Sequence, residues 1–235
     1  MKKAIVLIIV LLTIACGGKE ADLTVTGTIK GLKKGTVYLQ ALRDTTLVML
    51  DSMEMNGEVP FELKSELEEP EVLFLMLDKN SKEDERIAFF ADKGLTEINT
   101  TLKTYSVSPE INGSSQQEKL AEFKAMISKF NNRNLELIKE RFETQQSGDT
   151  AAINAKTAEA ESLLKRKYLF AINFVMNNKD SEIAPYIALT EVFDANITYL
   201  DTIYRSLPKD IAGSLYGNQL EKYIEERRTA QDSIQ

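Results

Sequence analysis

Cys16 is the only cysteine of the 235 residues, and the chain contains no histidine. A single thiol cannot form an intrachain disulfide or a Cys-x-x-Cys redox pair. Without histidine, the chain cannot build a Ser-His-Asp triad, a Cys-His pair or a histidine-based zinc site. The remaining candidates for covalent chemistry are Cys16 itself, pairs of carboxylates and exposed hydroxyl groups.

Cys16 stands at the end of an apolar leader. Met1-Lys2-Lys3 gives the chain a positive start, and residues 4–15 are all apolar or small. A helix that spans a bilayer needs roughly 20 apolar residues, so this run is too short to cross and remain in the membrane. The pattern predicts a signal peptide over residues 1–15, with a short N-terminal membrane anchor as the alternative.

The residues before the thiol resemble the lipobox of bacterial lipoproteins. Leu12-Thr13-Ile14-Ala15-Cys16 has small residues before the cysteine, although Thr13 stands where leucine is usual. The resemblance implies lipidation of Cys16 by a diacylglyceryl group, cleavage after Ala15 and a mature chain that begins at Cys16. Each buried CH₂ of an acyl chain contributes about 0.8 kcal/mol, so two or more chains anchor a protein stably.

Residues 16–22 are small and polar, and they predict a flexible tether. Within it, Lys19-Glu20-Ala21-Asp22 resembles a weak form of the surface-export signal of Bacteroidetes lipoproteins; a plain spacer is the alternative. We therefore expect an outer-membrane lipoprotein, on either the periplasmic face or the cell surface.

The balance of charge narrows the choice of partners. The whole chain carries −7, and removal of Lys2 and Lys3 leaves 27 basic and 36 acidic residues, a balance of −9. Such a chain disfavours nucleic acid and anionic membrane surfaces as partners. We expect contact with the membrane through the lipid anchor and no binding of nucleic acid.

The first half of the mature chain alternates apolar and polar residues with a period of two, which predicts strands. Glycine-containing turns separate them. Gly31 to Gly35 and Asp92-Lys93-Gly94 each predict a hairpin, and Asn56-Gly57 is the strongest hairpin signal. Pro60 indicates a bulge or an edge position for the strand that contains it. The expected strands are 23–29, 36–42, 46–55, 59–63, 71–77, 86–91 and 95–101. They predict a β domain over residues 23–113, an antiparallel β-sandwich or a partly open barrel.

The period changes to that of helices near Asn112, and residues 114–235 are expected to form a helical domain. Ser114 with Gln117, and Ser115 with Glu118, match the capping-box pattern. Two helices of about 28 residues, separated by a break at residues 146–149, should form a long antiparallel helix hairpin. Shorter helices are expected at 182–193, 197–206 and 213–228. The fold class is therefore α+β.

The strand-rich half resembles domain of unknown function 4369, and the helical half resembles the connector that follows this domain in many Bacteroidetes thioredoxin-like lipoproteins. The first resemblance rests on residues 27–32 and 35–39, Leu50-Asp51-Ser52, Asn56-Gly57 and Ile111-Asn112-Gly113-Ser114. The second rests on residues 181–186 and Leu215-Tyr216-Gly217. In those relatives a thioredoxin-like domain with a Trp-Cys-x-x-Cys site comes next. This chain has no tryptophan and no second cysteine, so those redox residues have no counterpart, and we expect the N-terminal module alone.

Other patterns that could carry chemistry favour ordinary structure. The charged segment Asp78–Glu85 fails as a calcium loop, because Lys82 and Glu83 stand where a ligand and a glycine are required. Gly31 to Gly35 lacks the spacing of a phosphate-binding loop. Aromatic residues at helical spacing, such as Phe123, Phe130, Phe142, Tyr168, Phe170 and Phe174, favour a core over a ligand groove. The tyrosines 186, 199, 204, 216 and 223 are typical of interfaces, or of burial with the hydroxyl bonded at the rim.

A repeated tripeptide of aspartate, a hydroxyl residue and an apolar or small residue resembles the O-glycosylation pattern of exported Bacteroidetes proteins. It makes Thr150, Thr202 and Ser233 candidate O-glycosylation sites, whereas Ser52 is expected to lie in a strand. The alternative is that these residues cap helices and turns.

Together these patterns predict a membrane-anchored envelope lipoprotein that is not an enzyme and has no catalytic residues, cofactor or metal site. Its expected role is a non-catalytic binding or scaffolding module for an envelope protein or a small ligand. An alternative is an accessory subunit of a thiol-redox system that works in trans with a separate thioredoxin-like protein. A third hypothesis, an acid-dependent hydrolase, would need two converging carboxylates.

Overall fold

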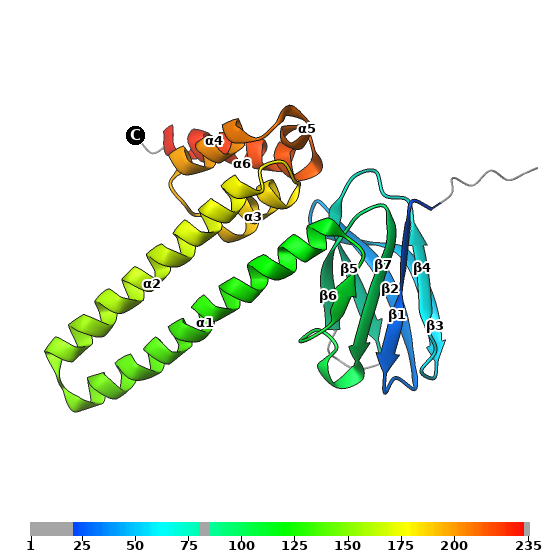
Figure 1. Cartoon of the computed structure of the whole chain (residues 1–235), viewed down its shortest axis with the longest axis horizontal. Helices are drawn as coiled ribbons and strands as arrows, with labels where there is room; N and C mark the ends of the chain where they lie inside the picture. Colours follow the sequence, from blue (N-terminus) through cyan, green and yellow to red (C-terminus); the bar gives the residue numbers. More distant parts are fainter. Residues whose placement is uncertain (1–20, 80–84, 233–235) are drawn as a thin grey trace, which may run out of the picture.

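The computed structural model describes residues 21–79 and 85–232. Strands occupy the first half of this chain and helices the second, which confirms the α+β class. Figure 1 shows the two parts side by side, with a long helix hairpin that extends away from the strands. The change from strands to helices falls between Asn112 and Ser115.

The described residues form eight strands in two four-stranded sheets. One sheet has the order β4-β1-β7-β8 and the other the order β3-β2-β5-β6. Among these strands only β1 and β7 pair in parallel, so the sandwich is mostly antiparallel. The strands are β1 Leu23–Lys30, β2 Lys34–Arg43, β3 Thr46–Asn56, β4 Phe61–Ser65, β5 Glu71–Asp78, β6 Glu85–Ala91, β7 Gly94–Thr101 and β8 Glu110–Asn112.

Alternate residues of the strands point between the two sheets and form the core of the sandwich. Leu23 and Val25 of β1, Leu39 of β2 and Leu73 and Leu75 of β5 are fully buried there. Each such side chain contributes about 1.5–3 kcal/mol through burial. The period of two in the sequence thus correctly marks the inward face of β1, β2 and β4.

Three turns expected to close hairpins instead carry the chain from one sheet to the other. Gly31 to Gly35 joins β1 to β2, Asn56-Gly57 ends β3 before β4, and Asp92 to Gly94 joins β6 to β7, all across the sandwich. The hairpin interpretation of these turns is wrong, because a glycine turn fixes where a chain reverses but not which strand becomes its partner. Pro60 directly precedes β4, which is an edge strand as expected.

Asp51 explains why the motif Leu50-Asp51-Ser52 matters to the sandwich. One oxygen of its carboxylate accepts a hydrogen bond from the Ser52 N–H at 2.8 Å. The other accepts from the Lys64 N–H of β4 at 2.7 Å. The side chain therefore joins the edge strands β3 and β4 of the two sheets and occupies a backbone donor that would otherwise remain open at the edge.

The helical half begins after a short 3₁₀ turn, η1 Leu102–Thr104, and the strand β8. Its first two helices form the predicted antiparallel hairpin, and the later helices gather near the base of that hairpin (Figure 1). The helices are α1 Ser115–Ser147, α2 Thr150–Asn177, α3 Ile183–Glu191, α4 Ile197–Ser206, α5 Lys209–Ala212 and α6 Leu215–Asp232.

The turn of the hairpin follows from local chemistry. Gly148 ends α1 in the left-handed conformation, and the Asp149 carboxylate caps α2 by accepting from the Ala152 N–H at 3.0 Å. Beyond the base, Arg133 bridges to Glu140 on α1 and Glu159 on α2. Lys156 bridges to the same two carboxylates, so ion pairs join the two helices where few apolar side chains are buried.

The helical core packs against the outer face of the sheet β3-β2-β5-β6. Val72 and Phe90 of that sheet belong to the same cluster of buried residues as Phe123, Phe174 and Leu220 of the helices. Strand β5 is therefore covered on both faces, with Leu73 and Leu75 inside the sandwich and Val72 beneath the helices. Burial on both faces explains why residues 71–77, one of the expected strands, are almost entirely apolar.

Candidate functional site

A groove with two adjoining lobes lies where the sheet meets α3 and α6, and we call it the sheet–helix groove. Its apolar lobe has a volume of about 440 Å³ and is lined mainly by Leu42, Val72, Phe74, Tyr186, Leu189 and Tyr216. Its acidic lobe, also of about 440 Å³, is lined by Arg43, Asp44, Glu66, Glu68, Glu69 and Glu71. Leu42, Asp44, Glu71, Leu215 and Gln219 line both lobes, so the two are continuous.

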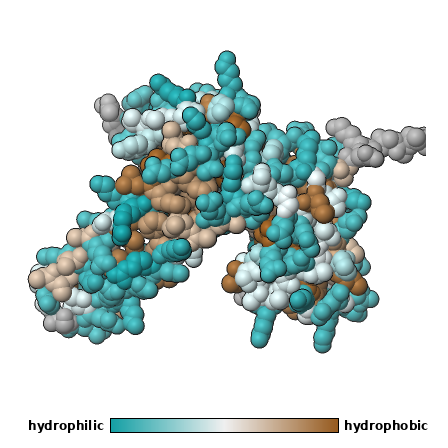
Figure 2. All heavy atoms as spheres, viewed as in Figure 1, coloured by the Kyte–Doolittle hydropathy of each residue, from teal (hydrophilic) through white to brown (hydrophobic). Residues whose placement is uncertain are grey.

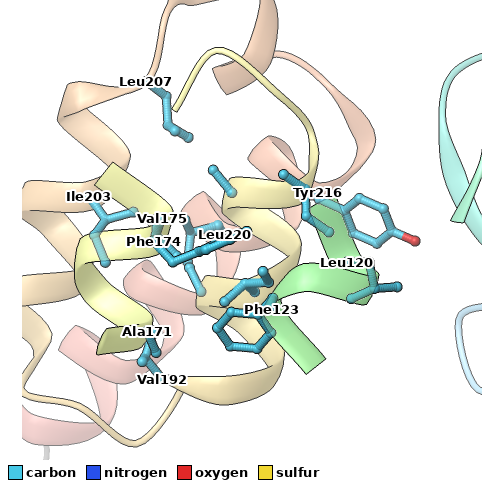
Figure 3. Packing of buried hydrophobic residues seen from close by; sticks show 14 of the residues in the cluster. Leu120, Phe123, Ala171, Phe174, Val175, Val192, Ile203, Leu207, Tyr216 and Leu220 are labelled. Carbon is cyan, nitrogen blue, oxygen red and sulfur yellow. The ribbon is translucent and has the colours of Figure 1, made fainter. Parts of the chain in front are cut away.

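Tyr216 fixes the wall of the apolar lobe to its floor. Figure 3 shows its ring at the edge of the helical cluster, with the hydroxyl directed away from that cluster. The hydroxyl oxygen accepts a hydrogen bond from the buried Val72 N–H at 2.8 Å. Burial raises the pKa of Tyr216, and it also raises the pKa of Tyr186, so both phenols remain neutral at physiological pH.

Three aromatic rings hold this contact in place. The Phe90 ring lies 5.5 Å from the ring of Tyr186 and 5.7 Å from that of Tyr216, both in edge-to-face geometry. The rings of Tyr186 and Tyr216 are 5.1 Å apart. Such pairs contribute about 0.5–1.5 kcal/mol each beyond the burial of their area. The groove therefore has a rigid wall.

The start of α6 is placed by the loop between β4 and β5. One carboxylate oxygen of Glu69 accepts from the Leu215 N–H at 2.7 Å, at the positive end of the helix. Gly217 allows the helix to lie against α5, because a Cβ there would meet the carbonyl oxygen of Ile211 at 2.1 Å. These contacts give Leu215-Tyr216-Gly217 a physical role in positioning Tyr216.

The acidic lobe carries an excess of negative charge. Among the described residues that line it, Arg43 has the one guanidinium, which donates to both oxygens of Glu71 at 2.5 and 2.7 Å. Glu71 is only 7% exposed, and this hydrogen bond raises the pKa of Arg43. Arg43 is thus already paired, while four further carboxylates line the same lobe. The lobe attracts cations and repels anions.

Two consecutive glutamines fix the start of α1, Gln117 to the sheet and Gln116 to the start of α3. The Gln117 Oε1 accepts from the Phe90 N–H of β6 at 2.8 Å. The Gln116 Oε1 accepts from the Ser181 hydroxyl at 2.5 Å and from the Ile183 N–H at 3.2 Å. Both glutamines are buried. The sequence indicated Gln117 only as part of a capping box, whereas its side chain binds the sheet.

Some of the tyrosines that the sequence singled out do lie at the groove. Tyr186 and Tyr216 line its apolar lobe, whereas Tyr223 donates to the Phe193 carbonyl oxygen away from it. Of the helical aromatics, Phe123 and Phe174 are core residues as expected. Phe142 is 62% exposed near the end of the hairpin, contrary to that expectation, because it lies with Leu135 and Ile138 on an exposed stripe of α1.

A second cavity, of about 340 Å³, lies between α1 and α2 and is lined by residues that include Phe130, Leu163 and Leu164. Figure 2 shows apolar surface along the junction of these two helices. Lys167 and Glu161 are the charged residues of its lining. This cavity has none of the excess charge of the sheet–helix groove.

The predicted modification sites fall in different places. Cys16 and Ser233 lie outside the described residues. Thr150 is exposed at the first position of α2, at the end of the hairpin. Thr202 is exposed on α4, and its hydroxyl donates to the Thr198 carbonyl oxygen at 2.7 Å. Lipidation and glycosylation at these positions stay predictions.

The charged segment considered for calcium also lies partly outside the described residues, since 80–84 are not among them. Over residues 21–79 and 85–232, no three side chains of the metal-binding types come together in a group that could hold a metal ion. In the same ranges, no helix has the length and apolar character needed to cross a bilayer.

Residues 23–120 match the family model described as Domain of unknown function (DUF4369). The match covers all eight strands and the first residues of α1, and it confirms the resemblance seen in the strand-rich half. It includes Leu42, Asp44 and Phe74 of the groove, but neither α3 nor α6. None of the curated proteins and none of the solved structures compared with the chain matches it significantly.

Proposed function

We propose that this protein is a lipid-anchored lipoprotein of a Bacteroidetes-type outer membrane and that it acts as a non-catalytic binding module through the sheet–helix groove. The observation that carries the proposal is the groove itself, which has an apolar lobe with a rigid aromatic wall beside an acidic lobe. Concave sites of this size with a few convergent polar groups are typical of ligand-binding surfaces.

The hydrogen bonds between the halves support a site that is formed before a ligand arrives. Tyr216 with Val72 and Gln117 with Phe90 join helices to strands at buried positions. A buried hydrogen bond of this kind is costly to leave unmade, about 1–3 kcal/mol, so the two walls stay together. A pre-formed groove loses little conformational entropy on binding, which favours a binding role.

The anchor would hold the acidic lobe near the membrane. β1 begins at Leu23, which pairs with Ser65, and the loop that carries Glu66, Glu68 and Glu69 follows directly. The seven residues 16–22 span at most about 25 Å when fully extended. Lipidation at Cys16 would therefore present the groove to envelope components close to the bilayer surface.

Affinity purification from intact cells tests the proposal. The tagged, lipidated protein is crosslinked to its partners in the cells with a short reagent and then purified. The variant Gln219→Trp, whose larger side chain fills the junction of the two lobes, is treated in the same way. The matched control is Asn132→Trp, at an exposed position of α1. We expect a partner that the wild type and the control retain and Gln219→Trp loses.

Equal recovery of all partners by the three proteins would contradict the proposal, as would turnover of an envelope substrate by the purified protein. A thioredoxin-like protein recovered through the groove would favour the alternative role as an accessory subunit of a redox system in trans.

A further inference from the structure

We propose that the sheet–helix groove binds a peptide segment of a protein partner in which apolar side chains are followed by lysine or arginine. This inference rests on the proposed function and adds the chemical class of the ligand. It follows from the different chemistry of the two lobes and from their continuity.

The apolar lobe is suited to aliphatic or aromatic side chains. Its floor is the outer face of the sheet, where Leu42 is 48% exposed beside Phe74 of the neighbouring strand. Its wall consists of Tyr186, Leu189 and Tyr216. Covering this surface with apolar side chains removes apolar area from water, which favours binding. The neutral phenols add polarity without charge.

The acidic lobe is suited to a cationic group. Arg43 is paired with Glu71, and Glu69 is bonded to the start of α6. Asp44 and Glu68 are exposed and line the lobe as well. Within the described residues these carboxylates do not form a metal-holding group. The amine of a lysine or the guanidinium of an arginine fits this chemistry, because each provides several donors on a long stem.

The continuity of the lobes lets a single ligand place an apolar group in one and a cationic group in the other. Leu42, Leu215 and Gln219 line the two lobes together, so a chain that fills one lobe reaches the other without leaving the surface. Each lobe has a volume of about 440 Å³, which exceeds a single amine. The acidic lobe repels the anionic headgroups of a bilayer, so a basic peptide is the occupant.

Fluorescence polarisation with the full lipidated protein in detergent micelles tests this inference. The probe is a fluorescein-labelled peptide, Gly-Ser-Leu-Phe-Lys-Arg-Ser-Gly. One matched peptide has Glu-Glu in place of Lys-Arg, and another has Ser-Ser in place of Leu-Phe. We expect the first to bind and both matched peptides to bind at least about tenfold more weakly, with affinity falling as salt rises.

Variants of each lobe locate the binding. The double variant Asp44→Asn and Glu68→Gln should weaken binding of the first peptide about three- to tenfold, because two exposed charge pairs with the peptide are lost. Asparagine also tolerates the positive φ of 55° at position 44. Leu42→Thr should weaken binding about threefold through lost apolar contact. The controls, Glu54→Gln and Leu95→Thr, are exposed strand positions outside the groove and should leave affinity unchanged.

Three results would overturn the inference. They are equal binding of the Glu-Glu peptide, an affinity for the first peptide that the groove variants do not change, and full displacement of that peptide by spermine, a simple polyamine, with an affinity equal to that of the peptide. If no peptide binds while Gln219→Trp still loses a partner in cells, the ligand class is wrong and the proposed function stands. If Gln219→Trp loses no partner, the proposed function itself fails.

Discussion

Tyr216 connects the two halves of the protein through one hydroxyl group. Its oxygen accepts a hydrogen bond from the Val72 N–H of β5. The pairing of β5 with β2 ends at Leu73, so this N–H has no backbone partner in β2. The motif Leu215-Tyr216-Gly217 was visible in the sequence, but its purpose was not. A phenol that completes a sheet can be recognised only when the strand beneath it is known.

Tyr216→Phe should lower the free energy of unfolding by about 1–3 kcal/mol, because the Val72 N–H remains buried without an acceptor. Urea titration followed by circular dichroism measures this change. Tyr199→Phe is the matched control, since Tyr199 is 58% exposed, and it should stay within about 0.5 kcal/mol of the wild type. Equal stability of the two variants would mean that the hydroxyl contributes nothing to the joint.

Gly27 is required by close approach of two strands. A Cβ at this position would lie 1.7 Å from the carbonyl oxygen of Ile98 in the parallel partner strand. Gly27→Ala should therefore destabilise the sandwich by about 3 kcal/mol or more.

Gly148→Ala is the matched control for that change, because its Cβ would meet nothing within 4 Å. Gly148→Ala should lower the free energy of unfolding by only about 1–2 kcal/mol, which is the cost of placing alanine in the left-handed conformation. Thermal unfolding of the two variants compares them, and a Gly27→Ala protein as stable as the Gly148→Ala protein would refute the steric argument.

At the scale of elements, strands and helices were largely predictable, whereas sheet partners were not. Period two located β1 to β7, and Gly148 with Asp149 located the hairpin turn. The pairing of β1 with β7 joins residues about 70 positions apart, which no local turn signal specifies. The side-chain partners of Gln116 and Gln117 were missed for a similar reason, because they lie at the start of α3 and on β6.

The α1–α2 hairpin should depend on pH through its ion pairs. Hydrogen bonds from Lys156 and Arg133 lower the pKa of Glu140 from its ordinary value, and bonds from Arg133 and Lys156 do the same for Glu159. A carboxyl with a lowered pKa stabilises the fold above its unfolded pKa, and that contribution is lost as the pH falls through the folded value. Arg133→Met should therefore be less stable than the wild type at pH 7.

Urea titrations at several pH values measure this effect, and the difference between the two proteins should shrink below about pH 4.5. Lys139→Met is the control, because its exposed partner Glu143 lies at 3.9 Å and its loss should matter little at any pH. A difference for Arg133→Met that does not change with pH would assign the effect to packing of the arginine stem.

At the scale of the whole molecule, the groove exists because two parts of the chain pack against each other. The match to the domain of unknown function covers the floor of the groove, while α3 and α6 supply the wall. The sequence marked Tyr186 and Tyr216 as interface residues. Nothing in the sequence distinguished Leu42, or the loop that carries Glu66, Glu68 and Glu69, from ordinary surface. A groove between parts becomes predictable only when the face on which they meet is known.

Phe90→Ala should disturb both parts together, since the Phe90 side chain is fully buried between the sheet and the helices. The expected loss is about 3–5 kcal/mol. Hydrogen exchange should rise in β5 and α6 alike. Phe142→Ala, at a side chain that is 62% exposed, should change neither. Faster exchange confined to the strands would show that the helices do not depend on this contact.

The central proposal is that the sheet–helix groove is the surface through which the protein binds its partner. Photo-crosslinking in intact cells tests it most directly, with benzoylphenylalanine at Thr190 on the groove rim or at Lys139 on the exposed side of the hairpin. We predict one partner that is captured from Thr190 and not from Lys139, and whose crosslinked segment carries lysine or arginine next to apolar residues. Capture of the same partners from both positions, or from Lys139 alone, would contradict the account.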